Sequence, residues 1–198
     1  MQLRSWIAWV AGITVLAWST VAVVQAQTVT FLDITDAVPG KYFDAATTAP
    51  DPLNPNRLIF GFHTGLDLQT WVSRTFTAST AAFYRASAMD TIRFLVAAPP
   101  GYYIAAISYT QRGIGTMART SKATGGATWV VDDIAEDLGL FGPNPALSHT
   151  LNLKDQHRTL VPVSITCGLF AFAPPLPGFA TISLTSAEVL VELLPLRQ

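Results

Sequence analysis

The chain has 198 residues, of which half are apolar and only 13% are charged, and its formal net charge is −1. A length of this order suits one domain, with room for an export segment. A usual charged fraction is about 25%, and the sequence has no basic stripe, so we do not expect nucleic acid as a partner. One cysteine, Cys167, excludes an intramolecular disulfide. Its apolar neighbours predict a buried thiol, with a reactive thiol or an intermolecular bridge as the alternatives.

The first 26 residues have the layout of a secretory signal peptide. Arg4 supplies the positive charge, Trp6–Ala17 is the apolar region, and Val24-Gln25-Ala26 forms a small-x-small cleavage site. Cleavage would leave 11 basic against 13 acidic residues and a net charge of −2, because Arg4 is the only charged residue removed. We therefore expect a secreted protein, or alternatively a periplasmic one. An uncleaved anchor is the competing interpretation, because the apolar run nearly reaches the ~20 residues that span a bilayer.

The mature chain should begin with a strand at Thr28–Ile34. Asp36–Asn56 holds several prolines and no periodic apolar pattern, which predicts a long irregular connection. Short apolar or alternating runs then predict strands at Leu58–Phe62 and Gln69–Ala78.

The stretch Asp90–Gly115 is the expected centre of the fold. Thr91–Ala97 and Tyr102–Thr110 have the composition of strands, and Pro99-Pro100-Gly101 between them predicts a turn. We expect these two strands to form a hairpin. Alternation along them predicts one buried face, with the following core residues: Ile92, Phe94, Val96, Ile104 and Ile107.

Further along, Thr116–Gly126 predicts a turn region, Ala127–Val131 a strand, and Ile134–Leu140 one turn of helix. The remaining strands are expected at Leu147–Leu153, Thr159–Ala173, Phe179–Thr185 and Ala187–Leu194. Nine or ten short strands with turns rich in proline and glycine predict an all-β protein. Because the connections differ greatly in length, we expect an antiparallel, jelly-roll-like β-sandwich that occupies residues 27–198 as a single domain.

Four features resemble bacterial exported β-sandwich proteins sorted by the exosortase (PEP-CTERM) system. They are the export segment, the turn AAPPGYYI, the run IAAISYTQRG and the final strand AEVLVELLP. The resemblance implies an envelope or matrix protein of unassigned activity. The sequence departs from that family at its C-terminus, where the Pro-Glu-Pro sorting tail is missing, so on this resemblance we expect a released protein.

Acidic residues gather in two places that could bind calcium, which takes oxygen ligands from loops. The first group surrounds the end of the first strand, and the second follows the strand Ala127–Val131. The candidate metal ligands are Asp33, Asp36, Asp132 and Asp133, with Asp44 close to the first pair. Solvated acidic turns are the alternative, because the regular calcium-loop pattern is absent.

Aromatic residues are numerous for a chain with so few charges, and exposed rings can stack on the apolar faces of sugars. The candidate ligand-binding residues are Trp71, Tyr102 and Trp129, with ordinary core packing as the alternative.

No catalytic residues are predicted. The three histidines do not form a metal-binding motif, and the chain has no G-x-S-x-G elbow. We therefore expect a non-catalytic envelope or extracellular-matrix protein that binds polysaccharide or another cell-surface component. A sandwich-fold glycan hydrolase or lyase, and a self-assembling structural protein, remain the alternatives.

Overall fold

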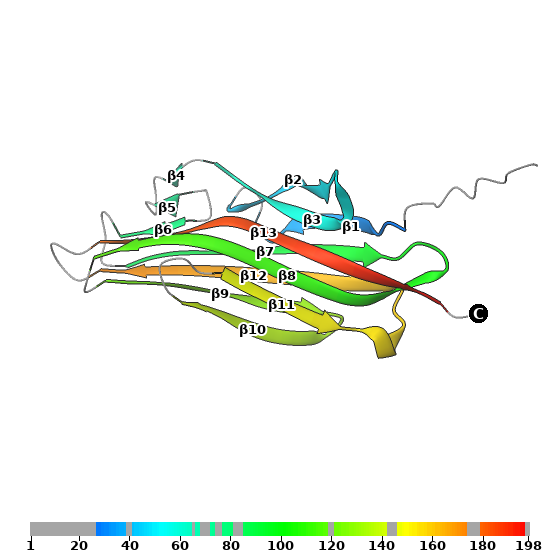
Figure 1. The fold of residues 1–198 in the computed structure, drawn as a ribbon. Helices are drawn as coiled ribbons and strands as arrows, with labels where there is room; N and C mark the ends of the chain where they lie inside the picture. Colours follow the sequence, from blue (N-terminus) through cyan, green and yellow to red (C-terminus); the bar gives the residue numbers. More distant parts are fainter. Residues whose placement is uncertain are drawn as a thin grey trace, which may run out of the picture.

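The computed structural model describes residues 27–38, 41–64, 66–67, 72–73, 77–80, 85–118, 121–141, 146–173 and 179–196. The predicted export segment, Met1–Ala26, lies outside these residues, as does Trp71. The described chain is built almost wholly of strands, which form two layers along the length of the molecule (Figure 1). A single 3₁₀ turn, η1 (Lys154–Gln156), interrupts them. Within the described ranges, no helix has the length and apolar character needed to cross a membrane.

Two antiparallel sheets contain most of the strands. Sheet A has the spatial order β1 (Thr30–Asp36), β7 (Arg85–Ala97), β12 (Leu160–Phe172), β9 (Lys122–Val131) and β10 (Ile134–Phe141). Sheet B has the order β11 (Ala146–Asn152), β8 (Tyr102–Met117), β13 (Ala180–Pro195), β3 (Asn54–Phe62) and β2 (Phe43–Asp51), with β6 (Thr77–Ser79) also paired to β13. A separate small ladder joins β4 (Leu66–Asp67) to β5 (Val72–Ser73).

The connectivity from β6 to β13 confirms the predicted jelly roll. The chain crosses from one sheet to the other at every step of this run except between β9 and β10. Sheet B thereby acquires the order β6-β13-β8-β11, and sheet A the order β7-β12-β9-β10. This eight-strand arrangement is the jelly-roll form of the β-sandwich. The first three strands widen the two sheets: β1 is added at the edge of sheet A, and β2 and β3 are added to sheet B.

The core lies between the two sheets and is formed by alternate residues of each strand. The predicted core residues are all buried: Ile92, Phe94, Val96, Ile104 and Ile107. Aromatic rings link the sheets, since Phe94 of β7 lies edge-on to Phe60 of β3, with ring centroids 6.0 Å apart. Phe60 in turn stacks on Tyr109 of β8 at 6.3 Å.

The expected central hairpin is wrong, although both of its strands exist. β7 pairs with β1 and β12 in sheet A, whereas β8 pairs with β11 and β13 in sheet B. Pro99-Pro100-Gly101 does form a tight turn, in which the amide of Tyr102 donates to the carbonyl of Pro99 at 3.1 Å and Gly101 has φ +84°. Proline followed by a glycine of positive φ fits a type II turn. Here the turn carries the chain across the sandwich, and alternation alone does not say which strand a given strand will pair with.

Stretches predicted as irregular or helical are also strands. The predicted loop Asp36–Asn56 contains β2, which pairs with β3 at the edge of sheet B through two register shifts. Proline is tolerated there because an edge strand has one side free of ladder hydrogen bonds. The predicted turn region Thr116–Gly126 contains the end of β8 and the start of β9. The predicted helical turn Ile134–Leu140 belongs to β10, which pairs residue for residue with β9.

The structure also confirms several other predicted strands. β1, β3, β11 and β12 overlap the expected ranges. Phe179–Thr185 and Ala187–Leu194 were expected as separate strands but form one, β13, whose register along β8 shifts between Leu184 and Ser186. A bulge at this point bends the strand without ending it.

Cys167 lies in the core, as predicted, and takes part in a small polar cluster. The hydroxyl of Tyr109 lies 3.0 Å from the Cys167 sulfur and donates to Oε1 of Gln111. Burial raises the pKa of the Cys167 thiol to about 12, partly opposed by the contact with Tyr109 and helped by the charge of Asp90.

We expect the folded protein to resist thiol reagents at pH 8, because Cys167 is buried and stays protonated, and only the thiolate reacts. Labelling with a chromogenic disulfide should require denaturant. Stability should also fall as the pH rises above the ordinary thiol value of 9.0 and towards 12, because the unfolded chain then releases a proton that the folded chain keeps. Rapid labelling of the native protein would contradict this assignment.

Candidate ligand-binding groove

Three open hollows lie in a row along the outer face of sheet A, over its central strand β12. Alternate residues of this strand, such as Cys167 and Leu169, point into the core. The residues between them line these hollows: Pro162, Ser164, Thr166, Gly168, Phe170 and Phe172. Hollows of about 410, 260 and 380 Å³ follow one another along them. We call this feature the sheet A groove. Ten residues of strand correspond to about 33 Å, so the groove is long enough for an extended ligand.

The first hollow contains two exposed aromatic rings. Phe170 is 47% exposed and Phe172 is 40% exposed. Strand pairing places Arg85 of β7 on one side of Phe172 and Lys122 of β9 on the other. The guanidinium carbon of Arg85 lies 5.9 Å from the centre of the Phe172 ring, within cation–π range. This end of the groove therefore offers two half-exposed aromatic rings with two cations beside them.

A row of glycines forms the floor of the middle hollow. Gly168 pairs with Gly126, which in turn pairs with Gly139 of β10, so three neighbouring strands lack side chains at the same level. A Cβ atom built on Gly168 would lie 3.3 Å from Cε2 of Phe170, closer than such contacts usually are. Glycine at this position thus allows the Phe170 ring to lie against the backbone and leaves open space beside it.

Hydroxyl groups and one carboxylate border the glycine row. The hydroxyl of Thr166 lies 2.7 Å from that of Thr91 on β7. On the other side, the hydroxyl of Thr128 donates to Oδ1 of Asp137 at 2.6 Å. Thr128, Asp137 and Thr166 line the hollow. A ligand lying over the aromatic rings would therefore meet donors and acceptors along its length.

The third hollow brings together three of the four predicted metal ligands, Asp33, Asp132 and Asp133. Their backbones account for aspartate at these positions. Asp132 and Asp133 have φ values of 47° and 69° and form the two-residue turn between β9 and β10. Such a turn needs positive φ at both residues, which aspartate tolerates. Asp33 has φ 51° within the β-bulge between Leu32 and Thr35.

The geometry of the described residues does not support a calcium site. Oδ2 of Asp132 lies 2.7 Å from Nε of Arg158, so an ion pair already neutralises this carboxylate. Asp36 lies apart from the hollow, beside His63, whose two ring nitrogens lie 3.9 Å from carboxylate oxygens of Asp36 and Asp44. Among the described residues, no three His, Cys, Asp or Glu side chains gather closely enough to bind a metal. Calcium therefore stays an untested prediction.

Of the predicted aromatic ligand-binding residues, the two that the structure describes, Tyr102 and Trp129, do not line the groove. Trp71 lies outside the described residues. Tyr102 begins β8 in sheet B, where the residue is half-buried and its hydroxyl accepts a hydrogen bond from Nε2 of Gln27 at 2.5 Å. Trp129 is fully buried, and its ring centre lies 6.3 Å from that of Tyr109 in the core. A sugar cannot reach Trp129, so the stacking role expected for it is wrong.

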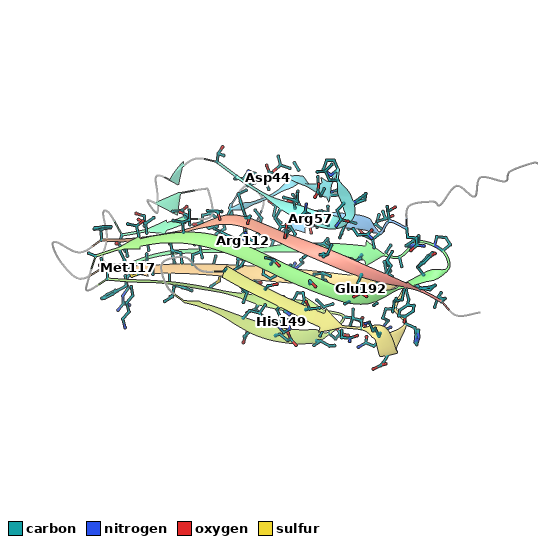
Figure 2. All side chains as sticks on the ribbon, in the orientation of Figure 1. Asp44, Arg57, Arg112, Met117, His149 and Glu192 are labelled. Atoms are coloured by element: carbon teal, nitrogen blue, oxygen red, sulfur yellow. The ribbon has the colours of Figure 1, made fainter. Side chains whose placement is uncertain are left out.

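Trp129 instead anchors a contact between the two sheets. Its Nε1 donates to Oε2 of Glu136 on β10 at 3.2 Å. The same carboxylate oxygen is in close polar contact with Nε2 of His149 on β11, the edge strand of sheet B. The His149 ring stands nearly perpendicular to the Trp129 ring, with centres 5.5 Å apart. Figure 2 shows His149 at this edge, where β10 and β11 lie next to each other. These three side chains join the sheets along one open side of the sandwich.

Sequence reasoning missed Phe170 and Phe172, although a signal for them exists. Once Cys167 is assigned to the core, alternation along β12 places residues 168, 170 and 172 on the opposite face. Two phenylalanines at such positions are expected to be exposed together.

Comparisons with known proteins do not identify a family. No family model matches the chain, and no curated protein matches it. A solved structure that matches is the native structure of a family 35 carbohydrate binding module from Clostridium thermocellum. The two are 10% identical, the match covers 82% of this chain and 93% of the other, and the TM-score is 0.23. A likeness with so low a TM-score supports no inference about function.

Proposed function

We propose that this protein is a non-catalytic polysaccharide-binding protein and that the sugar chain lies in the sheet A groove. The observation that carries the proposal is the pair of exposed rings, Phe170 and Phe172, in a long groove bordered by hydroxyl groups. Sugar rings present apolar C–H faces that stack on aromatic rings, while their hydroxyl groups need donors and acceptors beside them.

The position of the groove argues against a peptide ligand added as an extra strand. β12 pairs on both sides, with β7 and with β9, so its backbone groups are already used in ladders. Strand addition needs an unpaired sheet edge. A ligand over β12 must therefore be recognised through side chains, which suits a sugar polymer.

The predicted export segment supports a location outside the cell, where polysaccharides of envelopes and matrices occur. We propose that the protein is secreted after cleavage following Ala26. N-terminal sequencing of the protein from its native host tests this part separately: a new N-terminus at Gln27 is expected, and a membrane-bound chain that still begins at Met1 would contradict it.

The proposed function is tested by measuring binding of the purified protein to neutral and acidic polysaccharides, with affinity electrophoresis followed by calorimetry. We expect saturable binding without release of new reducing ends. Turnover that is lost in Asp137→Asn would favour the glycan-active enzyme, because this carboxylate lines the middle hollow. Large assemblies of the protein with itself, without affinity for any glycan, would favour the self-assembling alternative.

Calcium binding is tested separately, by thermal unfolding. A ligand that binds only the folded state raises the melting temperature by mass action, so the calcium prediction requires a higher melting temperature in millimolar Ca²⁺ than in chelator. An unchanged melting temperature would end that prediction and leave the groove unaffected.

A further inference from the structure

The charges along the sheet A groove are unevenly distributed. Among the described residues, the hollow around Phe170 and Phe172 is lined by two cations, Arg85 and Lys122, and by no carboxylate. The opposite hollow is lined by the three aspartates of the β-bulge and the β9–β10 turn, with Arg93 among them. The groove therefore has a basic aromatic end and a mainly acidic end.

The two cations at the aromatic end have no acidic partner in the part of the chain that the structure describes. Within the described ranges, neither Arg85 nor Lys122 forms an ion pair. Arg57 and Arg158, in contrast, each lie within 4 Å of a carboxylate. The guanidinium group of Arg85 lies over the Phe172 ring, which holds it beside the aromatic surface. The charges of both side chains remain available to an anion.

The spacing of these groups fits one sugar unit. Arg85, Phe172 and Lys122 occupy one level of three neighbouring strands, and Phe170 lies one level further along. Neighbouring strands are about 4.8 Å apart, and successive levels on one face are about 6.6 Å apart. A sugar stacked on Phe170 or Phe172 therefore lies within reach of one or both cations.

We infer that the aromatic end of the groove binds an acidic sugar, whose anionic group is held by Arg85 and Lys122. Arginine can bind a carboxylate through two parallel hydrogen bonds, and lysine adds a point charge. Asp33 and Asp133 at the other end, which Arg158 does not neutralise, would disfavour a second anion there. The expected ligand is therefore a polysaccharide in which acidic sugars alternate with neutral ones or lie further apart. This inference rests on the proposed function and specifies the ligand class.

The test compares acidic polysaccharides with their own carboxyl-reduced forms, in which each carboxylate has become an alcohol. Hyaluronan, in which every second sugar is acidic, is the suitable probe. Polygalacturonate, in which every sugar is acidic, is its comparison, and dextran sulfate with free sulfate controls for simple anion binding. We expect at least one acidic polymer to bind about tenfold more tightly than its reduced form, with the preference falling as salt is raised.

The variant Arg85→Gln/Lys122→Gln should lose this preference while keeping the residual affinity for the reduced polymer. Its matched control is Arg112→Gln/Lys154→Gln, which removes the same charge from exposed residues of β8 and η1, outside the groove. The control should behave like the parent protein.

The outcomes separate the two proposals. Binding of neutral polymers that is unaffected by Arg85→Gln/Lys122→Gln would overturn the acidic-sugar inference and leave the proposed function intact. Two results would show that the preference depends only on net charge: equal weakening of binding by both double variants, or equal binding of dextran sulfate and the best uronate polymer. Either result would also overturn the acidic-sugar inference. Binding of no polysaccharide by a folded protein would overturn the proposed function itself.

Discussion

Replacing Phe170 and Phe172 together by alanine is expected to weaken polysaccharide binding by roughly thirtyfold or more, because aromatic anchors at the centre of a binding site often contribute about 2 kcal/mol or more. Both rings are close to half exposed and lie on the outer face of sheet A. Their removal should change the free energy of unfolding by no more than about 0.5 kcal/mol, as is usual for surface positions. Calorimetric titration of the double variant, with a denaturant curve for stability, makes both measurements.

The matched control is Phe179→Ala. Phe179 is 46% exposed, similar to the groove rings, but it precedes β13 and does not line the groove. Its replacement should leave affinity unchanged. Unchanged affinity in the double variant, or equal losses in the double variant and the control, would show that sugars do not bind on β12.

Alternation along strands explains why the class of fold could be predicted from the sequence. Residues such as Ile92 and Phe94 are buried, as expected. A strand with one apolar face buries that face in the core, and this fixes which of its residues point inward. Alternation does not say which strands pair. The turn at Pro99-Pro100-Gly101 has the same local chemistry whether the next strand returns alongside or crosses to the other sheet. The central hairpin was therefore wrong although both strands and the turn were right.

The groove shows a second limit of sequence reasoning. It depends on residues of three strands that meet only through register, as Arg85, Phe172 and Lys122 do. No local motif marks such a row. The acidic residues had the opposite problem, because Asp132 and Asp133 are conspicuous in the sequence, yet their positive φ values explain them as residues of a tight turn. The metal prediction for these two residues stays untested, but the turn already gives a conformational reason for aspartate at both positions.

Replacing Trp129 by alanine is expected to lower the stability of the protein strongly. Trp129→Ala removes a fully buried indole that packs on Tyr109 and on His149. Large aromatic residues truncated in a packed core typically cost about 3–5 kcal/mol. The variant also loses the hydrogen bond from Nε1 to Glu136, which helps to join β9 to the edge where the two sheets meet. Urea unfolding should therefore show a much lower midpoint with a similar slope.

The same variant separates the core from the binding site. Since Trp129 does not line the groove, the protein that remains folded should bind polysaccharide with the affinity of the parent, whereas Phe170→Ala/Phe172→Ala should lose affinity and keep its stability. Trp129→Phe keeps most of the ring volume and allows the comparison even where the alanine variant is too unstable to purify. Loss of binding by a stable Trp129→Phe protein would show that this tryptophan takes part in ligand binding, and it would contradict its burial in the core. A free energy of unfolding within about 0.5 kcal/mol of the parent for Trp129→Ala would contradict its place in the core.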